Sequence, residues 1–205
     1  MILKLKDGDV KIELFEDTAP NHVKRIKELA NAGKYDNVVF HRVIDGFMAQ
    51  TGDVKIELFE DVAPNHVKRI KELANSGKYD NVVFHRVIDG FMAQTGDGKF
   101  GNSESKDFDL RRAGMGGSDF PDLEQEFNSL PHDRGTLSMA RAQDPNSANS
   151  QFFICFQPAP ILDRLYTVFG KVIEGMEFVD KIKRGDQNNN GAVTDPDKII
   201  SFKSQ

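Results

Sequence analysis

The sequence predicts a mainly β fold, an antiparallel barrel with few helices, from three observations. Short stretches that alternate apolar and polar residues recur along the chain, and turn residues bound each of them. Only two helical patterns accompany these stretches, if a segment that occurs twice in the chain is counted once. Many strands with so few helices are typical of a barrel. The composition, 39% hydrophobic and 29% charged over 205 residues, suits one globular domain with a sizeable core.

The first elements are a hairpin, a helix and two strands. Apolar and charged residues alternate on both sides of the turn Asp7-Gly8-Asp9, so residues 2–15 are expected to form two half-buried strands. Pro20 suits a first helical position and Gly33 can end the helix. Residues 38–44 and 47–51 are then predicted as strands. The apolar stripe of the helix consists of Val23, Ile26, Leu29 and Ala30.

Residues 9–52 recur almost unchanged as residues 53–96, with a period of 44. Only Thr18 and Ala32 differ from their counterparts, which are Val62 and Ser76. A solenoid is a poor explanation, because its repeats drift in sequence and it needs three or more units to bury a core. We therefore interpret the repeat as a recent tandem duplication, natural or engineered, within a single domain that spans residues 1–205.

The second half of the chain is predicted to contain a long loop, three strands, a helix and a final strand. Residues 97–135 are rich in Gly, Ser, Asp and Asn, as in ordered surface loops that carry function. Their glycines lack the strand-to-helix context of a dinucleotide-binding fingerprint. The strands are expected at 135–141, 151–156 and 166–172, the helix at 176–183, and the last strand at 199–202.

One segment matches the opening of a calcium-binding EF-hand loop, through Asp186, Asn188 and Asn190. The twelfth position of that loop is Asp197 instead of the usual Glu, and Pro196 precedes it. A strand, and not a helix, is predicted to follow. We interpret the segment as a polar turn, and we predict neither a metal nor a cofactor.

The stretch FHRVIDGFMAQTGD at residues 84–97, also present at residues 40–53, suggests a recognition site. Asp89-Gly90 between two apolar runs is a strong hairpin signal, and a hairpin places Arg86, Phe91 and Gln94 on adjacent strands. A cation, an aromatic ring and an amide suit recognition of an apolar ring that bears an amide. They do not suit nucleophilic attack.

This stretch, together with Ser138-Met139-Ala140-Arg141 through Ser150-Gln151-Phe152-Phe153-Ile154, resembles the two signatures of the cyclophilin family of peptidyl-prolyl cis-trans isomerases. The resemblance covers essentially the whole chain once the repeat is counted a single time. It implies a closed eight-stranded antiparallel barrel capped by two α-helices, with the duplicated strand-helix-strand-strand segment as an addition. It also implies an enzyme that accelerates rotation about X-Pro bonds and assists protein folding, with proline-containing peptides and unfolded or flexible protein segments as partners.

By this resemblance Arg86 is the catalytic residue. Strand alternation supports part of the remaining set independently, because Gln151 and Phe153 should share one face of a strand while Phe152 and Ile154 point to the other. His85 is better explained as a hydrogen-bonded structural histidine than as a catalytic group. The implied substrate-binding residues are Phe91, Met92, Gln94, Ala140, Arg141, Gln151, Phe153, Ile161, Leu162 and Tyr166.

Three positions depart from the animal members of the family. Ile161 stands where animal members carry Trp and many bacterial members carry Phe, while Arg141 and Tyr166 stand where animal members have Asn and His. Turnover should survive these changes. Binding of the family's inhibitor cyclosporin is expected to be weak, because a flat ring is missing from the pocket edge.

The repeat offers a second version of the first half of the site. The complementary half, Ala140 through Tyr166, occurs once, so one chain can complete one site. Copy one, copy two, or a switch between them near Gly33 and Gly77 could fill it, and chain entropy does not separate these routes. Two of the three routes lead to Arg86, which we therefore choose. The alternative residues are Arg42, Phe47, Met48 and Gln50.

The displaced copy is too apolar for comfortable disorder. We expect it to pack on its own barrel or to enter the barrel of a neighbouring molecule, which would give domain-swapped self-association. Two other functions stay open, a non-enzymatic proline-peptide binding module and an interaction scaffold built on the duplicate. The intact set of Arg86, Phe91, Gln94 and Phe153 favours the enzyme.

Charge and apolar runs exclude several further classes of function. The formal net charge of −5 provides no electrostatic footprint for nucleic acid. Residues 1–7 are too short and too charged for a signal peptide, and no apolar run approaches membrane-spanning length. Cys155, the single cysteine, is expected to be a buried small hydrophobe. We therefore expect a cytoplasmic protein without nucleic-acid or membrane partners.

Overall fold

The computed structural model describes the backbone of residues 1–5, 8–35, 40–44, 48–51 and 53–204. It describes the side chains of residues 1–2, 11–35 and 53–204. The chain divides into two compact units, residues 1–52 and residues 53–205. The two near-identical segments therefore belong to different units. None of the helices in the described ranges is long and apolar enough to cross a membrane.

The described residues of the first unit form two antiparallel strand pairs and one helix. Strand β1 (Ile2–Leu5) pairs antiparallel with β2 (Gly8–Lys11), so the second predicted strand is shorter than expected. Helix α1 (Pro20–Asn31) begins at the predicted proline, and Gly33 follows it with a left-handed φ of 68°. Strand β3 (Phe40–Ile44) pairs with β4 (Met48–Thr51), while residues 38–39 and Phe47 of the predicted strands lie outside the described residues.

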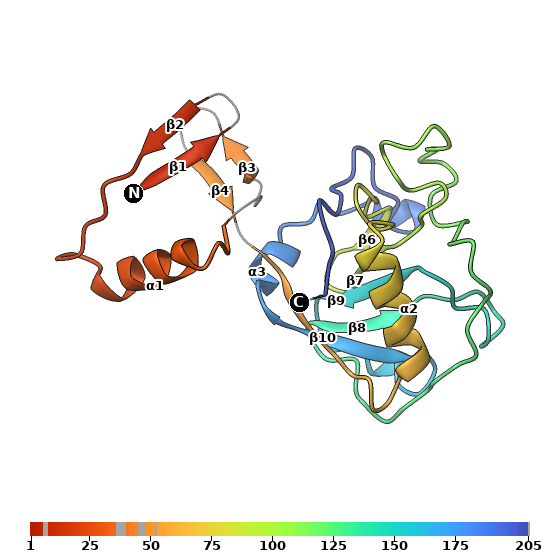
Figure 1. The fold of residues 1–205 in the computed structure, drawn as a ribbon. Helices are drawn as coiled ribbons and strands as arrows, with labels where there is room; N and C mark the ends of the chain where they lie inside the picture. The colour runs from red at the N-terminus through yellow and green to blue at the C-terminus, as the bar shows by residue number, and fades with distance from the viewer. Residues whose placement is uncertain (6–7, 36–39, 45–47, 52, 205) are drawn as a thin grey trace. The chain divides into compact units, whose positions relative to one another are not determined.

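The second unit is built on one antiparallel sheet with the order β5-β10-β8-β9-β7-β6 (Figure 1). Helix α2 (Pro64–Asn75) follows β5, and α3 (Met176–Val179) follows β10. Two short 3-10 helices, η1 (Pro160–Leu162) and η2 (Gln187–Asn189), complete the unit. The strands are β5 (Lys55–Leu58), β6 (Arg86–Ile88), β7 (Met92–Thr95), β8 (Thr136–Met139), β9 (Phe152–Cys155) and β10 (Val168–Glu174).

The described sheet is open, since β5 and β6 form its two edges and no ladder of the described residues joins them. The mainly β fold is confirmed, but the predicted closed eight-stranded barrel is not. Two segments account for the difference. Strand β1 pairs with β2 in the first unit, and residues 199–202 form no strand, although Ile199 exchanges backbone hydrogen bonds with Asn81 and Val82. The helix predicted at 176–183 is also shorter than expected.

The core lies between α2 and one face of the sheet. The helix buries Val67, Ile70, Leu73 and Ala74, at the spacing of an amphipathic stripe. Figure 1 shows the helix lying across the sheet, and its stripe packs in one cluster with residues of all six strands. The sheet residues that face it include Val87, Ala93, Leu137 and Ile154.

The long loop that begins at Asp97 is organised by a buried carboxylate. Asp97 is fully buried, and its two oxygens accept backbone N–H groups from Lys99, Phe100, Gly114 and Gly116 at 2.8–3.0 Å. Charge-assisted bonds of this kind are stronger than neutral ones. The loop predicted from composition is therefore an ordered structure without helices or named strands at 97–135.

Glu126 attaches the far end of this loop to the start of α2. Its carboxylate accepts N–H groups from the backbone and side chains of Asn65 and His66, at distances of 2.6–3.1 Å. The two backbone N–H groups belong to the first helical turn, where they have no partner within the helix and a negative charge is favourable. Burial alone would raise the pKa of Glu126, but the hydrogen bonds from His66 and Asn65 lower it.

Candidate active site

The register of four strands places the predicted site residues on the sheet face opposite the core. Arg86 pairs with Gln94, Gln94 with Phe153, and Phe153 with Ser138, which forms one row across β6, β7, β9 and β8. The next row, Val87, Ala93, Ile154 and Leu137, belongs to the core cluster. Successive residues of a strand point to opposite faces, so this register separates the site from the core.

The hairpin predicted at Asp89-Gly90 is confirmed. Ile88 pairs with Met92 across the turn, the Phe91 N–H donates to the Ile88 carbonyl at 3.0 Å, and Gly90 has a left-handed φ of 70°. Glycine adopts this φ without the steric cost of a Cβ. The turn therefore brings the arginine and the glutamine to directly opposite positions.

Nine of the predicted residues surround one cavity of about 190 Å³. Its floor is apolar, because Met92, Phe153 and the buried Cys155 and Ala159 form a small cluster beneath it. Burial raises the pKa of the Cys155 thiol to about 12, so the thiol stays neutral as expected of a buried hydrophobe. The nine residues are Arg86, Phe91, Met92, Gln94, Ala140, Arg141, Phe153, Leu162 and Tyr166.

Phe153 is held on two sides by aromatic rings. His132 stacks on it at 6.1 Å between centroids, and Tyr166 contacts it edge-on at 5.8 Å. His132 is itself fixed by Asp163 at 2.9 Å and by Ser138 at 3.0 Å. The Arg141 guanidinium lies 4.6 Å from the centre of the Tyr166 ring, a cation–π contact that fixes this wall of the cavity.

Two predicted residues lie outside this cavity. Ile161 is 75% exposed on η1 and does not line it, whereas its neighbour Leu162 does. Gln151 lines an adjoining cavity of about 520 Å³, which shares Gln94, Ala140 and Arg141 with the first. The two cavities therefore adjoin at these three shared residues.

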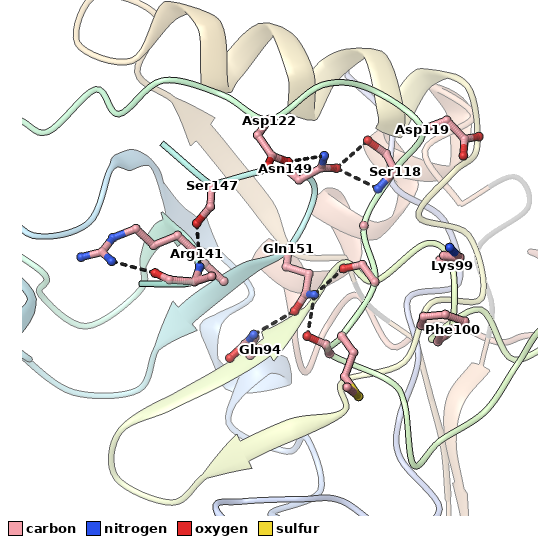
Figure 2. A pocket seen from close by; sticks show the side chains of 16 residues that line it. Gln94, Lys99, Phe100, Ser118, Asp119, Asp122, Arg141, Ser147, Asn149 and Gln151 are labelled. Atoms are coloured by element: carbon pink, nitrogen blue, oxygen red, sulfur yellow. Dashed lines mark hydrogen bonds between the residues drawn. The ribbon is translucent and has the colours of Figure 1, made fainter. Parts of the chain in front are cut away.

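Figure 2 shows the adjoining cavity and the amide chain at its edge. The Gln94 side-chain amide donates to the side-chain oxygen Oε1 of Gln151 at 2.9 Å. The Gln151 amide then donates to the Gly114 and Gly116 carbonyls at 3.0 and 2.7 Å. The long loop thus holds Gln151, and Gln151 holds Gln94 beside Arg86.

His85 is buried, but the predicted hydrogen bonds of its ring are not found. Neither ring nitrogen has a hydrogen-bond partner among the described residues. Burial lowers the pKa of His85 to about 4, against the opposing effect of Asp97, so the ring is neutral near pH 7. A Cβ on Gly114 would lie 2.9 Å from this ring, so the loop packs directly on it.

Asn190 is a site contact that the sequence interpretation missed. It accepts hydrogen bonds from the Arg86 guanidinium at 3.0–3.3 Å, although 104 residues separate the two. No local pattern links residues so far apart. The turn predicted around Asp186 is the only sequence signal that pointed to this segment.

The first copy has only part of these surroundings. Arg42 pairs with Gln50, and Ile44 with Met48, in the β3–β4 hairpin, which repeats the register of β6 and β7. Phe47 lies outside the described residues. Strands β8, β9 and β10 belong to the second unit, where they form one sheet with β5, β6 and β7.

Comparisons with known proteins agree with this fold. The family model described as "Cyclophilin type peptidyl-prolyl cis-trans isomerase/CLD" matches residues 1–55 and 51–204. The chain therefore belongs to the cyclophilin-type peptidyl-prolyl cis-trans isomerases. These are enzymes that catalyse rotation about peptide bonds that precede proline.

Individual relatives carry the same description. A probable peptidyl-prolyl cis-trans isomerase of Brucella suis is 55% identical over 200 residues, which are 98% of this chain and 79% of that protein. Peptidyl-prolyl cis-trans isomerase B of Bacillus subtilis is 38% identical over 184 residues, 89% of each chain.

Solved structures of the family are similar to most of the chain. A Cryptosporidium parvum cyclophilin type peptidyl-prolyl cis-trans isomerase, crystallised in the presence of the dipeptide Ala-Pro, has a TM-score of 0.62 at 33% identity. The match covers 75% of this chain and 94% of that one. Cyclophilin AquaCyp293 from Hirschia baltica has a TM-score of 0.57 at 27% identity, and the match covers 72% and 68% of the two chains.

Proposed function

We propose that this protein catalyses X-Pro isomerisation at the cavity around Arg86, with the second copy of the repeat as the working one. Rotation about a peptide bond must overcome amide resonance, a barrier of about 18–20 kcal/mol. Catalysis of this step needs no proton transfer. It needs a pocket that binds the twisted amide more tightly than the planar one.

Arg86 supplies the interaction that grows as the bond twists. The proline nitrogen regains a lone pair in the twisted amide and can then accept a hydrogen bond. A guanidinium is always charged in proteins and always a donor. Burial lowers the pKa of Arg86, which reflects its partly water-free position beside Tyr166. In such a site a preorganised donor is worth more than in water.

The remaining residues hold the substrate. Phe153, Met92 and Leu162 present an apolar surface for the proline ring, while Gln94 and Gln151 offer amides to the peptide backbone. The observation that carries the proposal is the row Arg86–Gln94–Phe153, which sets a cation, an amide and an apolar ring side by side. Proline-containing peptides and flexible protein segments are the proposed partners. Weak binding of cyclosporin, and a cytoplasmic location, stay predictions from the sequence.

Separate substitutions of the two repeated arginines test this proposal. In an X-Pro peptide isomerisation assay, Arg86→Ala should reduce kcat/KM by roughly 100-fold, about 2.7 kcal/mol of transition-state stabilisation. Arg42→Ala, the matched control, should leave it unchanged. Loss in Arg42→Ala alone would assign the site to the first copy. A parent protein without activity would favour the non-enzymatic binding module or the scaffold.

The origin and the role of the first copy are part of the same proposal. The family model matches from residue 1 and again from residue 51, as a tandem duplication within one parental domain would produce. In the first unit Phe15 is 66% exposed and Ile12 is 38% exposed. We propose that it exchanges strands with a second molecule.

One edge of the second unit fits this exchange. In the first unit the Ile12 N–H donates to the Met1 carbonyl, so the backbone of Ile12 faces the β1 segment. Its counterpart Ile56 lies on β5, an edge strand of the described sheet. The Phe59 N–H donates to the Phe169 carbonyl, so the backbone of Phe59 faces β10. Backbone groups of successive strand residues point in opposite directions, and Ile56 lies three positions earlier, so its N–H and carbonyl point away from β10. The free edge of β5 is therefore equivalent to the edge of the first copy that pairs with β1, and it could pair with β1 of another molecule.

Removal of residues 1–5 tests the exchange. Sedimentation at increasing concentration should show dimers for the full chain and fewer dimers for the truncated one. A full chain that stays a compact monomer at high concentration would eliminate the exchange and leave the isomerase proposal untouched.

A further inference from the structure

We propose that Asn190 is a positioning residue that orients the Arg86 guanidinium without neutralising it. This inference rests on the proposed function, since it concerns the same arginine. It identifies a residue from a distant turn as part of the machinery that acts on the proline amide.

Asn190 contacts the guanidinium through two oxygens. The Arg86 Nε–H donates to the Asn190 main-chain carbonyl at 3.0 Å and also approaches its side-chain Oδ1 at 3.3 Å. The Nη2 group donates to the same Oδ1 at 3.0 Å. On the other side, Nη1 donates to Gln94 Oε1 at 3.3 Å. The guanidinium is thus held from two directions in its own plane.

The turn that carries Asn190 is seated on the outer edge of β6. The Val87 N–H donates to the Gly191 carbonyl at 2.8 Å, and the Gly185 N–H donates to the Val87 carbonyl at 2.9 Å. A Cβ on Gly191 would lie 2.5 Å from Ile88, so only glycine permits this approach. The β6 strand therefore fixes the turn that holds its own arginine.

The backbone of Asn190 is suited to this contact. Its φ of 52° lies in the left-handed region, which asparagine tolerates better than most residues. In this conformation both its main-chain and its side-chain oxygen reach one guanidinium. Asp186 closes the turn by accepting the Asn188 N–H at 2.9 Å.

The contacts that the described residues make with the guanidinium leave N–H donors for a substrate. A guanidinium has five N–H groups. The Nε–H and one N–H on each terminal nitrogen point at Asn190 or Gln94. One N–H on each terminal nitrogen is left, and both lie in a plane that the two partners fix. A fixed donor direction is worth more to catalysis than a freely rotating one.

Among the described residues, each acceptor that the guanidinium contacts is neutral. The acceptors are two amide oxygens and one main-chain carbonyl, and no ion pair of the described residues includes Arg86. Asp89, in the same hairpin, pairs with Arg184 at 3.0 Å instead. A carboxylate partner would hold the guanidinium equally well but would offset the charge that the twisted amide uses.

Two substitutions separate orientation from charge. Asn190→Gly keeps the left-handed backbone and the carbonyl but removes Oδ1, and it should lower kcat roughly 10-fold with KM little changed. Asn190→Asp keeps the shape and both oxygens but adds a negative charge, and it should lower kcat by a similar or larger factor. Asn188→Asp, the matched control, adds the same charge two positions away and should retain parental kcat.

A double-mutant cycle decides whether Asn190 acts through Arg86. In the Arg86→Ala background, Asn190→Asp should cause no further loss of activity. A further loss, or a parental kcat in either Asn190 variant, would overturn the inference. Circular dichroism of each variant separates these effects from unfolding. Should Arg86→Ala itself be fully active, the proposed site is wrong, and that result is distinct from a failure of the Asn190 variants.

Discussion

Helices α1 and α2 have the same twelve residues, PNHVKRIKELAN, and the same backbone, yet their surroundings differ. Their N-cap residues have φ values of −140° and −144°, and each begins at proline. Val23 is the buried residue of α1, whereas α2 buries six residues. Ile26 is 39% exposed in the first copy, and its counterpart Ile70 is fully buried in the second.

The difference shows that burial of the repeat depends on the C-terminal strands, which occur once in the chain. The second copy packs with β8, β9 and β10 in a single core. In that unit His66 is buried and bonded to Glu126, while the equivalent His22 of the first copy is exposed. Identical sequences therefore contribute unequally to stability, and three measurements can break or sharpen this contrast.

The largest expected contrast is in stability. Ile70→Ala should lower the free energy of unfolding by about 2–5 kcal/mol, because it leaves a cavity beside a fully buried side chain. Ile26→Ala, the matched change in the first copy, should cost about 0.5 kcal/mol. Urea denaturation followed by circular dichroism measures both. Equal costs would show that the two copies are equally buried in solution.

The next contrast is in the pH dependence of stability. The pKa of His85 is about 4 in the folded protein, against 6.5 for an ordinary histidine. The unfolded chain therefore binds the proton more tightly, so this stability is present above pH 6.5 and is lost as the pH falls toward 4. The loss should be on the order of 3 kcal/mol.

His85→Phe isolates this titration. Unfolding measured at pH 7 and pH 4 should show a smaller difference in the variant than in the parent, because the titrating ring is gone. His41→Phe makes the same change in the first copy and should retain the parental difference. A parental pH dependence in His85→Phe would mean that other groups account for it.

The smallest effect is expected from deletion of a whole copy. Removing residues 9–52 or residues 53–96 leaves chains of 161 residues that differ only at the Thr18/Val62 and Ala32/Ser76 positions, all of which are exposed. Both chains should be active monomers with equal kcat/KM. An inactive chain in either case would show that one of these two positions matters to the site.

Local patterns predicted much of what the second unit shows. The Asp89-Gly90 turn, the opposition of Arg86 and Gln94, and the placement of Phe152 and Phe153 on opposite faces all follow from turn chemistry and strand alternation. Other features depend on residues far apart in the chain. Asn190 beside Arg86 is one such feature, and the exposure of Ile161 is another.

The amino-acid sequence alone determined the helices, the hairpins and the family, because each depends on neighbours within a few residues or on long motifs. Only the tertiary structure showed that the second copy packs in one core with the C-terminal strands and that Arg86 lines the cavity. The physical reason is that both copies satisfy the same local rules equally well. Burial depends instead on the single C-terminal half, whose strands can cover one copy of the repeat.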